Sequence, residues 1–205
     1  MSKIKLTKGE LKRQRDSLKQ FRHYLPTLQL KKQQLQMKIL EAQMALTKHL
    51  LNLKEKEGRI ENWVGLLADV AIDIKPWIAP QRIEVDAMNV AGANIPIFKN
   101  IYFPEAEYDF YATPFWIDQA IEEFRSLAKL LAEIAVARKQ IAVLEHELRI
   151  TTQRVNLFEK VKIPECLENI RRIRIYLGDQ QANAVGVSKV AKHKVEAREL
   201  VEVLV

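Results

Sequence analysis

The feature that most constrains this sequence is a repeat of apolar residues every three and four positions between Leu11 and Ile74. A helix carries one apolar stripe over many heptads only when a partner helix follows it, so the repeat predicts a coiled coil. Polar residues, among them His49, occupy only four of the repeat positions. The residues expected in this first seam are Leu11, Leu18, Leu25, Leu35, Ile39, Leu46, Leu53, Ile60 and Leu67.

This seam predicts a long N-terminal helix over residues 1–76. Thr7 followed by Glu10 matches a capping box near its start. Pro76 is expected to end the helix, because the residue before a proline avoids helical conformation. Pro26 lies inside it and removes one backbone hydrogen bond, so we expect a kink or a break there.

A second seam predicts a long C-terminal helix with a weak tail over residues 113–205. Thr113 is a favoured N-cap residue, and Pro114 suits the first helical position. Pro164 is the expected interruption, and the residues after Gly178 show only a weak apolar face. The seam residues expected in this helix are Leu131, Ile134, Ile141, Leu148 and Val155.

The segment between the helices, residues 77–112, has the pattern of a β-hairpin and a loop. Polar and apolar residues alternate from Arg82 to Ala87, and an apolar, aromatic run follows from Ile95 to Phe103. Pro96 and Pro104 are expected to limit the second strand. The fold class is therefore mainly α: a long antiparallel two-helix coiled coil with a short β-hairpin-like insertion, forming one continuous rod-like domain with its chain ends together.

Charge is distributed unevenly along the chain. Residues 1–60 hold 15 basic and 5 acidic groups, residues 61–120 hold 3 and 9, and residues 121–205 hold 15 and 12. Basic ends around an acidic middle suggest an acidic partner. Nucleic acid and an acidic protein cavity both satisfy this pattern.

The sequence shows no pattern of catalytic, metal or cofactor chemistry. Glycines are not grouped as a phosphate-binding loop requires, and the histidines lack metal-ligand spacing. Cys166 is the single cysteine, which favours a reducing, cytoplasmic location. No apolar run reaches the roughly 20 residues of a membrane span. Met37 and Met44, seven residues apart, are expected in the core or flanking the seam rather than in a binding groove.

One block of residues is specific enough to indicate a family. Arg154, Val155, Asn156, Glu159, Ile163 and Pro164 form an R-V-N-x-x-E-x-V-x-I-P block. This block and the helices around it resemble the D subunit of V-type and archaeal A-type rotary ATPases. A second block, made up of Leu28, Leu30, Lys31, Lys32 and Leu35, is similar to a basic, leucine-rich stretch near the N-terminus of that family.

The resemblance implies a central-stalk rotor subunit with no catalytic residue and no cofactor. Such a subunit transmits torque between ATP turnover in a catalytic A/B hexamer and proton or sodium transport through the membrane sector. Its implied partners are that hexamer, the other central-stalk subunit (F) and the membrane-ring adaptor (C/d), and its implied place is cytoplasmic, peripheral to the membrane. A coiled-coil scaffold or tether is the alternative interpretation. A basic helical nucleic-acid-binding protein is a third, although the interleaved aromatic residues of a nucleic-acid platform are missing.

Overall fold

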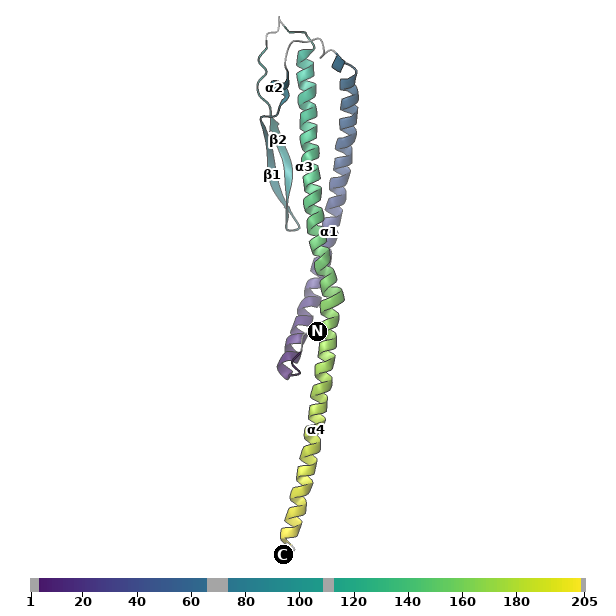
Figure 1. Ribbon diagram of the computed structural model, residues 1–205, viewed down its shortest axis with the longest axis vertical. Helices are drawn as coiled ribbons and strands as arrows, with labels where there is room; N and C mark the ends of the chain where they lie inside the picture. The colour runs from purple at the N-terminus through teal and green to yellow at the C-terminus, as the bar shows by residue number, and fades with distance from the viewer. Residues whose placement is uncertain (1–3, 66–73, 109–112, 204–205) are drawn as a thin grey trace. The chain divides into compact units, whose positions relative to one another are not determined.

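The computed structural model describes residues 4–65, 74–108 and 113–203. Two long helical segments flank a two-stranded antiparallel hairpin along the chain, which confirms the mainly α fold class (Figure 1). The chain divides into two compact units, residues 1–29 with 153–205 and residues 30–152. The single rod-like domain stays a prediction. The elements are α1 (Lys8–Glu61), α2 (Lys75–Ile78), β1 (Arg82–Val90), β2 (Ala93–Tyr102), α3 (Ile117–Asn156), the π-helix η2 (Leu157–Lys162) and α4 (Ile163–Val203).

Helix α1 begins as the sequence predicts but ends earlier. The hydroxyl oxygen of Thr7 accepts the backbone N–H of Glu10 at 3.3 Å, as in the N-cap half of a capping box. The helix ends at Glu61, between Gly58 and Gly65, well before Pro76. Glycine lowers helix stability by about 1 kcal/mol relative to alanine, so an apolar repeat alone does not keep this stretch helical.

Pro26 lies inside α1, and the helix is not broken there. Proline removes one backbone N–H, but the residues before and after it keep their helical conformation. Beside it, the hydroxyl of Thr27 donates a hydrogen bond to the carbonyl of Tyr24 at 2.8 Å. Of the two outcomes expected at Pro26, the break is absent, and the kink stays a prediction.

In the unit of residues 30–152, α1 and α3 lie side by side in opposite directions. Lys56 Nζ donates to the hydroxyl of Ser126, and His49 Nδ1 lies 3.3 Å from a carboxylate oxygen of Glu133. Nearer the start of this unit, Lys31 Nζ lies 4.0 Å from a carboxylate oxygen of Glu147. As the position along α1 decreases, the position along α3 increases, so the helices are antiparallel.

The hairpin packs against these helices through a small core. Leu35 and Ile39 of α1, Val90 and Ile95 of the hairpin and Leu144 of α3 form one cluster of buried side chains. Leu35 and Leu144 are at most 1% exposed. Burying a side chain of this size contributes about 1.5–3 kcal/mol, so the core fixes the hairpin on the helix pair.

The hairpin turn uses residues with positive φ. Ala91 and Gly92 have φ of 51° and 81°, the combination that a two-residue type I′ turn requires. The side-chain oxygen of Asn89 accepts the backbone N–H of Gly92 at 3.1 Å. Turn chemistry therefore sets the register in which Val90 faces Ala93.

The sequence predicted that Pro96 would limit the second strand, and this prediction is wrong. It lies inside β2, opposite Ala87 of β1. The described sheet has two strands, so each strand has an edge without ladder hydrogen bonds, where a proline is tolerated. The carbonyl of Pro96 accepts a hydrogen bond from the side chain of Gln140 at 2.6 Å. Pro104 lies beyond the end of β2, in agreement with the prediction.

Helix α3 begins at Ile117, a few residues after the predicted start at Thr113 and Pro114. A tight turn precedes it, in which the N–H of Ile117 donates to the carbonyl of Pro114 at 3.1 Å. Ile117 is 1% exposed, so burial of its side chain accompanies the start of the helix.

Candidate functional site

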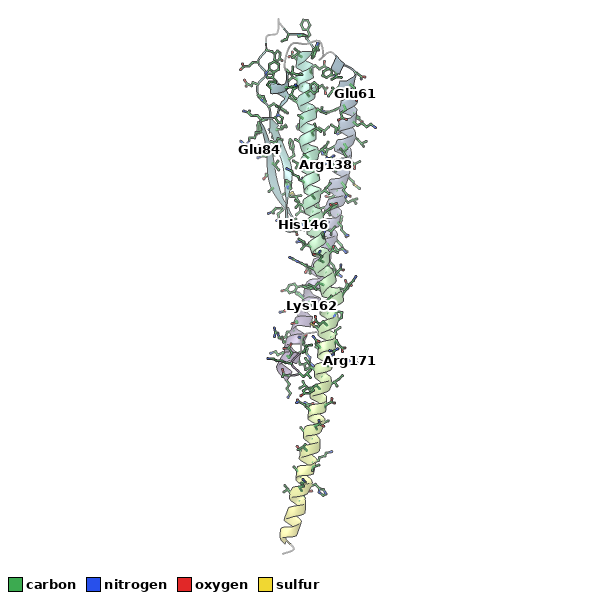
Figure 2. The ribbon with its side chains drawn as sticks, viewed as in Figure 1. Glu61, Glu84, Arg138, His146, Lys162 and Arg171 are labelled. Carbon is green, nitrogen blue, oxygen red and sulfur yellow. The ribbon has the colours of Figure 1, made fainter. Side chains whose placement is uncertain are left out.

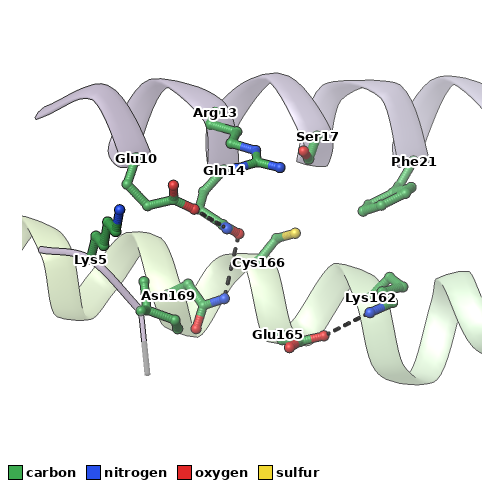
Figure 3. A pocket seen from close by; sticks show the side chains of 11 residues that line it. Lys5, Glu10, Arg13, Gln14, Ser17, Phe21, Lys162, Glu165, Cys166 and Asn169 are labelled. Carbon is green, nitrogen blue, oxygen red and sulfur yellow. Dashed lines mark hydrogen bonds and ion pairs between the residues drawn. The ribbon is translucent and has the colours of Figure 1, made fainter. Parts of the chain in front are cut away.

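The candidate functional feature of this chain is the pairing of its long helices. In the unit of residues 1–29 and 153–205, α1 packs against η2 and α4. The rings of Phe21 and Phe158 lie with their centroids 5.1 Å apart. Farther along, Asn169 Nδ2 lies 3.4 Å from Oε1 of Gln14 (Figure 3). These pairs again run in opposite directions along the two helices.

The family-motif residues surround the π-helical segment η2. The N–H of Ile163 donates to the carbonyl of Phe158, five residues earlier. Pro164 has no N–H to donate. It follows Ile163, where the backbone hydrogen bonds have already changed from the α-helical spacing of four residues to the π-helical spacing of five. Val155 is buried at 5% exposure. The exposed motif residues are Arg154, Asn156, Glu159 and Pro164, and Ile163 is half-buried.

The buried face of α4 is confined to its first turns. Cys166, Ile170 and Ile173 are at most 7% exposed, and every side chain from 178 to 196 is exposed. Within this unit, α4 continues far beyond the start of α1, so the start of α1 and the end of α4 do not lie together (Figure 1). This overturns the expectation of adjacent ends. Residues 178–196 of α4 therefore expose all faces of the helix.

The groove in Figure 3 lies between α1 and α4, has a volume of about 540 Å³ and is open to solvent. Glu10 and Arg13 line it from α1, Cys166 lines it from α4, and Lys5 lines it from the segment before α1. Burial raises the pKa of the Cys166 thiol, and the neighbouring Glu165 carboxylate raises this pKa further. The thiol is therefore held in its protonated, weakly nucleophilic form.

The described residues provide no other obvious chemistry. They contain no group of three His, Cys, Asp or Glu side chains that could hold a metal ion. No helix in the described ranges is long and apolar enough to cross a membrane. Arg138, His146 and Arg171 are exposed on the helices (Figure 2). The surface of the long helices is thus a charged, solvated one.

Among the predicted seam residues that the structure describes, all but one are buried or half-buried; that they form the seam stays a prediction. Leu131 is 48% exposed, whereas its neighbours Leu130 and Ala132 are 7% and 8% exposed. The buried stripe passes beside Leu131, because an α-helix of 3.6 residues per turn drifts relative to a heptad repeat. Leu67 lies outside the described residues. Buried seam residues are Leu35, Ile39, Ile60, Ile134 and Val155, and half-buried ones are Leu11, Leu18, Leu25, Leu46, Leu53, Ile141 and Leu148.

Sequence reasoning missed Arg125, which holds the base of the hairpin. Its Nε donates to the carbonyl of Trp77 at 3.0 Å, and its Nη2 donates to the carbonyl of Pro104 at 2.6 Å. Its guanidinium carbon lies 5.5 Å from the centroid of the Phe103 ring. One α3 side chain therefore binds the segments on both sides of the hairpin. No sequence signal separates this arginine from the surface arginines of the same helix.

Similarity to known proteins covers almost the whole chain. The family model of the ATP synthase D subunit matches residues 10–193. The chain belongs to this family. The V-type ATP synthase D subunit of Borreliella burgdorferi is 45% identical over 192 residues, which are 94% of this chain and 95% of the relative. The V-type ATP synthase D subunit of Chlamydia abortus is 34% identical over 204 residues, 96% of each chain. That of Chlamydia pneumoniae is 33% identical over 199 residues, 95% of this chain and 94% of the relative.

Family membership confirms the resemblance carried by the block from Arg154 to Pro164. The chain is a non-catalytic D subunit in the central stalk of a V-type rotary ATPase, as the sequence predicted. Its described pairs of long helices agree with this role. ATP turnover and ion transport are activities of the complex.

Proposed function

We propose that this chain is the shaft that carries torque between the catalytic A/B hexamer and the membrane sector. The observation that supports this function best is the cross-tied helix pair. Gln14 and Asn169 join the helices in one unit, and His49 and Glu133 join them in the other. Two helices that are linked side by side resist bending and twisting more than one helix does, because neither can rotate without the other.

The proposed partners are the A/B hexamer, the second central-stalk subunit (F) and the membrane-ring adaptor (C/d). The exposed part of α4 carries Lys189, Lys192 and Lys194 together with Asp179 and Glu196, and Lys192 Nζ lies 3.6 Å from a carboxylate oxygen of Glu196. The lysines on this surface are suited to acidic groups in a surrounding collar. Charge interactions of this kind are smoothly distributed, so a rotating shaft can pass from one equivalent surface to the next. The chain is then cytoplasmic and peripheral to the membrane through the complex.

A rotation assay tests this proposal. The complex is reconstituted from purified subunits with an Arg138→Cys, Cys166→Ser chain and fixed to a surface through the hexamer. A bead is attached to the new thiol at the exposed position 138. ATP should drive stepwise rotation of the bead, and a non-hydrolysable ATP analogue should stop it. A complex that assembles and hydrolyses ATP while the bead stays still would contradict the shaft function.

A further inference from the structure

A second groove lies between α1 and α4 in the unit of residues 1–29 and 153–205. It has a volume of about 400 Å³ and is open to solvent. Its lining residues are Arg15, Leu18, Lys19 and Arg22 of α1 and Leu167, Ile170 and Arg174 of α4. The lining thus combines four cations with three apolar side chains and contains no acidic residue. We name it the cationic groove.

The four cations form the rim of the cationic groove. Arg15, Lys19 and Arg22 are four and three residues apart, which places them on one face of α1, and Arg174 adds a charge from α4. All four side chains are exposed, and no ion pair is seen for any of them within the described ranges. Like charges at this spacing destabilise a helix, so the described part of the chain does not supply the counter-charge that the rim needs.

The apolar side chains form the floor of the cationic groove. Ile170 is 7% exposed, Leu18 is half-buried and Leu167 is 44% exposed. Leu18 and Ile170 are thus more buried than the cations around them. An occupant that fits must offer apolar side chains to the floor and negative charges to the rim.

The acidic residues near the cationic groove do not neutralise its rim. Residues 8–22 and 157–174 hold 11 basic and five acidic side chains. The acidic ones are Glu10, Asp16, Glu159, Glu165 and Glu168, and none of them lines the groove. Carboxylate oxygens of Glu165 and Glu168 lie 3.2 Å from Lys162 Nζ and 3.0 Å from Arg172 Nε, and both cations are outside the groove. The surroundings of the groove therefore remain basic.

Another exposed apolar surface, on α1, has neighbours of mixed charge. Met37 and Met44 are 65% and 63% exposed, so the expectation of a core position is wrong for both. Helical spacing places Glu41, Lys48 and Glu55 on the same face of the helix. Charges of both signs do not select a partner, whereas the charges that line the cationic groove have one sign.

We propose that the cationic groove binds an acidic amphipathic helix of the catalytic A/B hexamer. A groove between two helices accepts the row of side chains that a third helix presents. Carboxylates three and four residues apart on that helix match the spacing of Arg15, Lys19 and Arg22, and apolar residues beside them reach the floor. This inference rests on the proposed function, because it takes the partner from the same complex.

The apolar floor separates this occupant from other polyanions. The phosphate groups of a nucleic acid match the four cations, but they bring no apolar side chain to Leu18 and Leu167. Apolar surface contributes to binding only when the occupant removes it from water. The contribution of the floor therefore distinguishes an amphipathic helix from a nucleic acid.

Loss of the cations should weaken binding to the hexamer. Lys19→Gln with Arg174→Gln removes two charges from the rim, and Lys48→Gln with Lys54→Gln removes two exposed lysines from the other unit. Both proteins should keep the helical circular dichroism of the wild type. Affinity for the purified A/B hexamer should fall at least about tenfold for the groove variant and change less than about twofold for the control. Equal affinities of the two variants would overturn the inference.

Loss of the apolar floor should weaken the same binding. Leu167→Gln removes an apolar side chain from the floor, and Ile175→Gln is the control because Ile175 is 55% exposed on α4 and does not line the groove. Affinity for the hexamer should fall at least about fivefold for the floor variant and change less than about twofold for the control. An unchanged affinity of the floor variant would indicate a site for any polyanion and would overturn the inference.

A photo-crosslinker identifies the occupant directly. Benzoylphenylalanine replaces Leu167 in a complex reconstituted from purified subunits, and mass spectrometry identifies the adduct. The probe should react with a peptide of the hexamer that carries acidic and apolar residues at helical spacing. The absence of an adduct, or an adduct with a second copy of this chain, would overturn the inference. A wild-type chain that does not bind the hexamer would contradict the proposed function as well, whereas binding that the groove variants leave unchanged would contradict only this inference.

Discussion

Asn169 of α4 donates a hydrogen bond to Gln14 of α1 across 155 positions of sequence (Figure 3). Gln14 is one of the polar positions in the first apolar seam, and it also donates to a carboxylate oxygen of Glu10 at 2.8 Å. Asn169 is 7% exposed. A polar pair within an apolar seam is satisfied only when the two helices keep one register, so this contact specifies how α1 and α4 align.

Replacement of this buried amide should destabilise the helix pair. Asn169→Ala removes the donor to Oε1 of Gln14, and we expect the free energy of unfolding to fall by about 1 kcal/mol. Urea denaturation followed by circular dichroism measures this loss. Asn183→Ala, on the exposed part of the same helix, is the control and should change stability by less than about 0.5 kcal/mol. Equal losses in the two variants would show that the contact does not stabilise the pair.

Arg125→Ala should loosen the hairpin without unfolding the helices. The variant removes the donors to the Trp77 and Pro104 carbonyls. Because core packing around Leu144 is unchanged, we expect faster amide hydrogen exchange in β1 and β2 and unchanged exchange in the middle of α3. Mass spectrometry of the exchanged peptides measures this. Arg138→Ala, an exposed arginine on the same helix, should leave exchange in the hairpin unaltered; acceleration by both variants would contradict the anchoring role.

The thiol of Cys166 should react slowly and at unusually high pH. The side chain is 5% exposed, and burial raises the pKa of its thiol. Only the thiolate attacks a disulfide reagent, so the reactive fraction should rise at a higher pH than it does for a free cysteine. The rate of reaction with an aromatic disulfide, measured between pH 7 and 10, tests this. Ser188→Cys in a Cys166→Ser background is the exposed control; equal rates for the two thiols at pH 8 would contradict the prediction.

Truncations should separate the contribution of the chain ends to coupling with the hexamer from the contribution of the hairpin to stalk contacts and regulation. Removal of residues 1–10 and 196–205 should weaken coupling to the catalytic hexamer and leave binding to the other stalk subunit intact. Excision of residues 82–103 leaves the contact of Gln14 with Asn169 and should change stalk contacts or the regulation of turnover. ATPase activity and subunit co-purification of reconstituted complexes measure both effects. Unchanged assembly and turnover in both cases would favour a coiled-coil scaffold over a shaft.

Local signals in the sequence were sufficient for the types of element in this protein. The heptad repeat predicted two long helices, the Thr7 cap marked the start of the first, and alternation from Arg82 predicted the hairpin. These signals act over a few residues, where helix and strand periods differ and caps have defined spacing. The block from Arg154 to Pro164 likewise identified the family, because its residue types and spacing are specific.

The tertiary structure decided which faces are covered and where the elements end. The sequence repeat continues past Glu61, yet α1 ends there, and the buried stripe of α3 passes through Leu130 rather than Leu131. The same packing left Met44 exposed and used Arg125 to hold both sides of the hairpin. Periodicity reports that a segment has an apolar face, but burial depends on residues far away in the sequence. Because burial depends on these distant contacts, local patterns did not determine which faces are covered or where the helices end.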